Sequence, residues 1–185
     1  MKKLVLSITI FALLLAACSG DVGQEVRGTI TTANVGFLLS ESEVDKHGRD
    51  GLSVYGDAVS FMDRAQENGA NVEGIEEWVG VDFAESVDGA RFNFSLLDMV
   101  DAETAGTRFD QIAEEFLLVE SEQGIGERFA GLAPKVGNVD TVVMFLVGDK
   151  VTLMTTTTSL IDSSPLMTSD QLVELARLVA PRIIP

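Results

Sequence analysis

Apolar and polar residues alternate with a period of two in two regions of this chain, and each region predicts a pair of β-strands. The first pair covers residues 77–83 and 90–96, with Asp88-Gly89 as a turn signal between them. The second pair covers 141–147 and 150–158, joined by Gly148-Asp149. The alternation places these residues of the first pair on one face: Ala90, Phe92, Phe94 and Leu96. In the second pair, one face carries Val151, Leu153, Thr155 and Thr157. We expect antiparallel hairpins with one face in the core and the other in contact with water.

Three segments show the spacing of three and four residues that is typical of amphipathic helices. The first runs from Asp57 to Glu67 and is followed by a stop signal, Asn68-Gly69. The second begins at Asp101, which suits an N-cap, and continues to Leu117. The third begins with the capping-box pair Thr168 and Gln171 and ends before Pro181. Each of these helices has one apolar stripe to bury.

The remaining apolar segments complete the predicted fold. Residues 26–40 are consistent with one or two short strands, and residues 128–132 with another. The predicted fold class is α+β, an antiparallel sheet with helices packed mainly on one face. A strand pair followed by a helix at 77–118, and again at 141–180, suggests two strand-strand-helix units.

The first 18 residues have the organisation of a secretion signal. Met1-Lys2-Lys3 is positively charged, and residues 4–17 form an apolar stretch shorter than a membrane span. Leu15-Ala16-Ala17-Cys18 resembles the lipobox of a bacterial lipoprotein, which implies cleavage between Ala17 and Cys18 and lipidation of the Cys18 thiol. We therefore predict a signal peptide at 1–17, a lipidated tether at 18–25 and one globular domain at 26–185.

Composition limits the chemistry and the partners of the mature chain. Cys18 is the only cysteine, so once it is acylated no disulfide or cysteine-based metal cluster can form. The net charge is −16, and loss of Lys2 and Lys3 makes it −18. This charge argues against nucleic acid and against direct contact with anionic lipids, so the lipid must supply the membrane anchor. We expect a monomer that folds without a metal or cofactor.

No catalytic motif is present. His47 lies between Asp45 and Asp50, but these residues do not follow the ligand order of a calcium loop, and an exposed loop is the simpler interpretation. The adjacent acids, Glu76-Glu77 and Glu114-Glu115, are most simply solvated. Gly124-x-Gly126 lacks the rest of a dinucleotide fingerprint. We therefore predict no catalytic, cofactor-binding or metal-binding residue.

Two aromatic residues, Tyr55 and Trp78, could have either a binding or a packing role. They could line a ligand pocket or pack at the edge of the core.

A second resemblance covers residues 75–183. Gly124–Glu127, Val142–Val151 and Leu172–Ile183 resemble the last part of a group of bacterial envelope lipoproteins of unknown function, in which a glycine-rich acidic turn precedes a hairpin and a closing helix. The resemblance implies an extracytoplasmic α+β module and supplies no catalytic residue.

Three function classes follow. The expected one is a lipid-anchored, non-enzymatic envelope module that binds a protein partner or a small ligand, in the outer membrane if the host is Gram-negative. The alternative is a carrier of lipid or another hydrophobic ligand, with a cavity walled by adaptable methionines: Met62, Met99, Met144, Met154 and Met167. The third is a hydrolytic enzyme. An exposed apolar patch would favour the first class, an apolar cavity the second and a cleft with convergent carboxylates the third.

Overall fold

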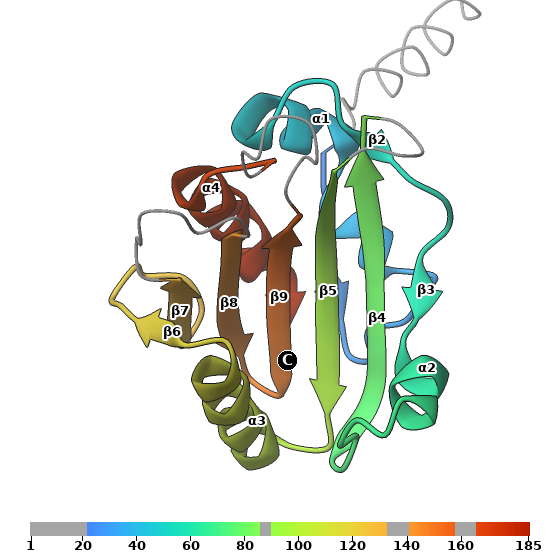
Figure 1. Cartoon of the computed structure of the whole chain (residues 1–185), viewed down its shortest axis with the longest axis vertical. Helices are drawn as coiled ribbons and strands as arrows, with labels where there is room; N and C mark the ends of the chain where they lie inside the picture. Colours follow the sequence, from blue (N-terminus) through green and yellow to red (C-terminus); the bar gives the residue numbers. More distant parts are fainter. Residues whose placement is uncertain (1–21, 86–89, 133–140, 158–165) are drawn as a thin grey trace, which may run out of the picture.

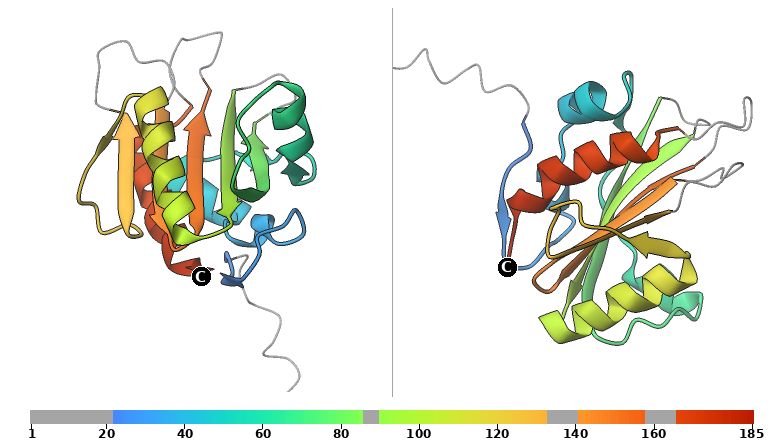
Figure 2. Two further views of the ribbon diagram at one scale, coloured as in Figure 1. Left: turned by 90° about the horizontal axis from the view of Figure 1, so that it is seen from below. Right: turned by 90° about the vertical axis from the view of Figure 1, so that its left-hand side faces the viewer.

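The computed structural model describes residues 22–85, 90–132, 141–157 and 166–185, and within them an antiparallel sheet carries helices on both faces (Figures 1 and 2). The fold class is α+β, as predicted. The strands are β1 (Val26–Arg27), β2 (Ser53–Val54), β3 (Val59–Ser60), β4 (Ile75–Ala84), β5 (Arg91–Met99), β6 (Leu118–Glu120), β7 (Arg128–Leu132), β8 (Thr141–Val147), β9 (Lys150–Thr156) and β10 (Ile183–Ile184). The helices are α1 (Glu41–Glu43), α2 (Met62–Glu67), α3 (Ala102–Glu115) and α4 (Ser169–Val179), with shorter helical turns η1 (Val35–Phe37), η2 (Val44–Gly48) and η3 (Ala180–Arg182).

The main sheet has eight strands in the described residues, in the order β2-β4-β5-β9-β8-β7-β6, with β3 also paired to β4. Both predicted hairpins are present: β4 pairs antiparallel with β5, and β8 with β9. The two hairpins meet at the centre of the sheet, where β5 pairs with β9. A separate parallel pair, β1 with β10, joins the start of the described chain to its end.

The prediction that the helices gather on one face is wrong, because the sheet has a hydrophobic core on each side (Figure 2). The α4-side core includes Phe83, Phe92, Phe94, Phe145, Leu172 and Leu175. The α3-side core includes Leu97, Met99, Phe109, Ile112, Met144 and Leu146. The physical reason is visible in β8, where the apolar run 142–146 is buried throughout and therefore needs cover on both faces. The two strand-strand-helix units exist, but α3 and α4 cover opposite faces.

Three local predictions from the sequence are wrong. In the first, strand pairing overrides the helical spacing of apolar residues. In the segment 57–67, Val59 and Ser60 form β3 against β4, and only Met62–Glu67 is helical. Residues 26–40 contain the short β1, and η1 follows in place of a further strand. Residues 41–51, expected to be an exposed loop, contain α1 and η2, in which Glu43 and Val44 are buried.

Both predicted helix caps are confirmed. Asp101 accepts a hydrogen bond from the Thr104 backbone N–H at 2.7 Å at the start of α3. At the start of α4, the Thr168 hydroxyl and the Gln171 side chain each accept a backbone hydrogen bond from the other residue. The Asp88-Gly89 turn lies outside the described residues. No helix in the described part of the chain is long and apolar enough to cross a membrane.

Candidate functional site

The α3-side face of the sheet is covered by helices over only one end of its strands. In Figure 1 this face is in front, with α2 and α3 at the bottom, and no helix crosses the upper parts of β4, β5 and β9. The α3-side core extends along β9 as far as Leu153. Beyond it lies a group of half-buried polar side chains, which we call the polar end of the sheet: Tyr55, Asp82, Arg91, Asn93 and Thr155.

Strand register assembles the polar end. Asp82 of β4 is directly opposite Asn93 of β5, and Asn93 is directly opposite Thr155 of β9. Because neighbouring strands lie about 4.8 Å apart, these three side chains form a straight row across the sheet. Arg91 projects from the same face two residues before Asn93. Tyr55 follows β2, and its backbone N–H bonds to the Asp82 carbonyl oxygen at 2.7 Å.

The side chains of the polar end hold one another in place. The Asp82 carboxylate accepts a hydrogen bond from Asn93 Nδ2 at 2.8 Å and pairs with Arg91 Nη1 at 3.4 Å. The Arg91 guanidinium lies 4.2 Å from the centre of the Tyr55 ring, within the range of a cation–π interaction. The Arg91 and Asp82 side chains remain 37% and 31% exposed. The site is thus ordered by internal contacts, balanced in charge and open to solvent.

The chemistry available at the polar end is hydrogen bonding. Amide, hydroxyl, carboxylate and guanidinium groups provide both donors and acceptors, and strands fix their spacing. The five residues include no histidine, cysteine or lysine. The arrangement therefore offers a polar ligand several hydrogen-bond donors and acceptors at fixed positions.

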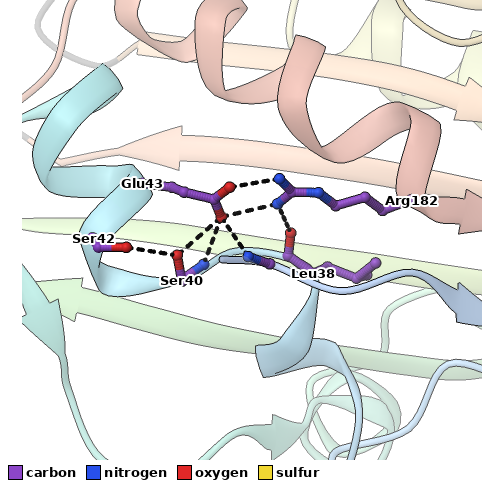
Figure 3. Close-up of polar contacts among 6 residues, drawn as sticks. Leu38, Ser40, Ser42, Glu43 and Arg182 are labelled. Atoms are coloured by element: carbon purple, nitrogen blue, oxygen red, sulfur yellow. Dashed lines mark hydrogen bonds and ion pairs between the residues drawn. The ribbon is translucent and has the colours of Figure 1, made fainter. Parts of the chain in front are cut away.

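A buried ion pair fixes the start of the described chain to its end (Figure 3). Glu43 of α1 pairs with Arg182 of η3 through Nη1 at 2.9 Å and Nη2 at 2.5 Å, and both side chains are largely buried. Glu43 Oε2 also accepts hydrogen bonds from the backbone N–H groups of Gly23 and Ser40. Burial raises the pKa of Glu43, but the hydrogen bonds from Arg182, Ser40 and Gly23 outweigh it and lower this pKa from 4.5 to about 2. These contacts tie the N-terminal segment, α1 and η3 together, which indicates a structural role.

A second buried charge lies at the opposite end of the strands from the polar end. Lys150 of β9 is 2% exposed; its Nζ lies 2.5 Å from Asp149 and 3.5 Å from Asp98. Asp98 also accepts the Ile30 backbone N–H at 2.9 Å. These contacts join β5, β9 and the N-terminal segment, so this cluster is also structural.

The residues singled out in the sequence do not come together at one site. Ala17 and Cys18 lie outside the described residues. Asp45 accepts the Gly51 backbone N–H, and the pKa of the exposed Asp50 is raised by a hydrogen bond and charge repulsion from Asp45. In the described residues, no three histidine, cysteine or acidic side chains are grouped so that they could hold a metal ion.

The other sequence candidates have structural surroundings. Glu77 accepts a hydrogen bond from the Ser60 hydroxyl, while Glu114 and Glu115 are exposed near the end of α3. Gly124 and Gly126 both have positive φ in a surface loop. Four of the five methionines considered as cavity walls are buried in the two cores: Met99, Met144, Met154 and Met167.

Of the two aromatic candidates, one belongs to the polar end and the other to packing. Tyr55 contacts Arg91 there, whereas the Trp78 ring packs against Phe61 with their centres 5.6 Å apart. The alternation over 90–96 already placed Arg91 and Asn93 on the water-facing side. Their meeting with Asp82 and Thr155 depends on strand register, which the sequence does not specify.

Comparison with known proteins supplies no family. No family model and no curated protein matches the chain. Among solved structures, the extracellular domain of PknH from Mycobacterium tuberculosis matches with a TM-score of 0.49 and 11% identity, covering 84% of this chain and 97% of that one.

Proposed function

We propose that this protein is a lipid-anchored, non-enzymatic module of the bacterial cell envelope that binds a polar ligand at the polar end of the sheet. The observation that carries the proposal is the row Asp82, Asn93 and Thr155, which lies across three strands beyond the helical cover. Strands rather than loops carry the row, so its hydrogen-bonding groups are held at fixed spacing before a ligand arrives.

Charge balance indicates the ligand class. Asp82 and Arg91 neutralise each other, so the site has no net charge to attract a strongly ionic ligand. The remaining groups, an amide and two hydroxyls, match neutral ligands rich in hydroxyl or amide groups. Neutral oligosaccharides and uncharged peptide segments have this chemistry.

Location in the envelope rests on the sequence. The charged start, the short apolar stretch and Cys18 after Leu15-Ala16-Ala17 support export followed by lipidation. This part of the proposal is supported by the signal pattern alone.

Ligand titration followed by NMR tests the binding site. Neutral oligosaccharides and neutral peptides are added to the ¹⁵N-labelled chain, and we expect amide shifts concentrated at Asp82, Asn93 and Thr155. Asn93→Leu replaces the central amide with an apolar group of similar size, and should weaken binding at least tenfold. The matched control, Gln111→Leu, changes an exposed polar residue on α3 and should leave affinity unchanged. Shifts confined to another surface, or equal effects of the two variants, would contradict the proposal.

A further inference from the structure

A stretch at the end of α3 exposes large apolar side chains next to one another. Phe116, Leu117 and Val119 are 45%, 67% and 54% exposed. Leu117 also has a φ of +55°, a conformation that is sterically unfavourable for a bulky side chain and that glycine usually adopts after a helix. The chain thus keeps an exposed leucine at a position where glycine would be more stable. Backbone strain of this kind clusters at functional sites.

The same stretch leads into β6, which is the edge strand of the main sheet (Figure 1). No other described strand pairs with the outer edge of β6. On its inner edge β6 pairs with β7, and the Ser121 N–H bonds to the Phe129 carbonyl. In an antiparallel ladder the bonded pairs alternate, so Val119 faces Gly131 in a bonded pair while the N–H and C=O groups of Leu118 and Glu120 point outward. These groups can template a further strand.

An apolar groove lies beside this edge, on the α4 side of the sheet. It has a volume of about 370 Å³. Its apolar lining consists of Val119, Phe129, Leu132, Val143 and Val173. Val119 therefore belongs both to the exposed apolar stretch and to the groove wall. A strand added along β6 would place alternate side chains toward this groove.

Charge around the edge selects among possible occupants. Four exposed carboxylates lie around the apolar stretch and the groove: Glu114, Glu115, Glu122 and Asp170. A fifth, Glu120, is exposed but pairs with Arg128. Among the described residues, the two arginines near the edge are paired, Arg128 with Asp110 and Glu120, and Arg177 with Glu174. A second copy of this chain would bring like charges together at the edge. A positively charged segment would meet complementary charge.

We infer that β6 is the docking edge for a basic, extended segment of a protein partner, which adds as a strand along Leu118–Glu120 and places an apolar side chain in the groove beside Val119. This surface is separate from the polar end of the sheet and does not depend on the function proposed for it. Backbone hydrogen bonds supply the register, the groove selects an apolar side chain, and the surrounding carboxylates select lysine or arginine at the alternate positions.

The test uses a fluorescent octapeptide of alternating valine and lysine, added to the full chain in detergent micelles and followed by anisotropy. We expect saturable binding that weakens as salt is added. Val119→Lys should weaken binding at least tenfold, because it places a positive charge at the groove wall. Val59→Lys is the matched control, since Val59 is a similarly exposed valine on a strand of the opposite edge. It should change affinity less than twofold.

Two further peptides separate strand addition from nonspecific attraction. An octapeptide that is N-methylated at alternate residues on the edge-facing side should bind at least tenfold more weakly, because it lacks the donors that a strand needs. A valine–glutamate octapeptide should not bind. Equal binding of the N-methylated or the glutamate peptide, equal effects of Val119→Lys and Val59→Lys, or no binding at all would overturn the inference. Concentration-dependent dimerisation that Val119→Lys abolishes, without peptide binding, would also overturn it and assign the edge to a second copy.

Discussion

The buried Glu43–Arg182 ion pair ties α1 to the C-terminal turn η3. The two residues are 139 positions apart, and Glu43 lies in a charged segment that resembles an exposed loop. Its partners come from the two ends of the described chain, Gly23 and Arg182. Asp101 and Thr168, by contrast, were predicted as caps because each bonds to a backbone group three residues away. Local hydrogen bonds can be predicted from spacing, whereas pairs set by the tertiary fold cannot.

Glu43→Gln tests the buried ion pair through its pH dependence. The pKa of Glu43 is about 2 in the folded protein, against 4.5 for the ordinary group. Its stabilisation is therefore complete above pH 4.5 and is lost as the pH falls toward 2. A shift of this size corresponds to about 3 kcal/mol. At pH 7 we expect the variant to lose about 3 kcal/mol of unfolding free energy, because Arg182 is left buried without a counter-charge. Between pH 4.5 and 2 it should lose less further stability than the wild type does.

Urea unfolding at pH 7, 4.5 and 2.5 provides the measurement. Glu174→Gln is the matched control, because Glu174 and Arg177 also form a glutamate–arginine pair but remain 53% and 45% exposed. An exposed pair is worth less than about 1 kcal/mol. Equal losses in the two variants would show that the Glu43–Arg182 pair is no stronger than a surface pair.

At the scale of elements, periodicity predicted the hairpins and the two long helices but not how they are placed. The alternation in β5 and β9 correctly separated the two faces of each strand. It did not show that Arg91 and Asn93 would share a face with Thr155, because that depends on the register between β5 and β9. It could not show that both faces would be covered, since β8 alone has a continuous apolar run. The segment at Val59 was predicted as helix because its apolar spacing fits a helix, and pairing with β4 makes it a strand. The three residues of β6 are too few to show any period.

Docking of α3 on the sheet depends on Phe109, and Phe109→Ala tests it. The ring is fully buried in the α3-side core, and the Arg128 guanidinium lies 4.3 Å from its centre. Truncation of a buried phenylalanine costs about 3–5 kcal/mol, because it removes the buried surface and leaves a cavity. Phe116→Ala, near the end of the same helix, removes a ring that is 45% exposed and should cost less than about 1.5 kcal/mol. Chemical unfolding of both variants measures the difference. A cost below 1.5 kcal/mol for Phe109→Ala would contradict the packing described for α3.

At the scale of the whole molecule, the described N-terminal segment is held against the C-terminal end of the fold. Gly23 is held by the Glu43 carboxylate, and β1 pairs with β10 next to the C-terminus. In Figure 2, β1 lies on the α4 side of the sheet and α3 on the other side. A lipid at Cys18 would thus attach the protein from the α4 side, while the face that carries α3 and the polar end looks away from that attachment.

Cys18→Ser tests the anchor on which this orientation depends. We expect the wild-type protein in the membrane fraction, with a fatty acid label and the added mass of a lipidated N-terminus, and in the outer membrane of a two-membrane host. The variant should lose the label, because a serine hydroxyl cannot form the thioether. Ser19→Ala, which changes the next residue and leaves the thiol, should behave as the wild type. Gly23 lies five positions after Cys18, so an anchored domain would start no more than about 18 Å from the lipid. Membrane retention and labelling of Cys18→Ser equal to the wild type would overturn both the anchor and this proximity.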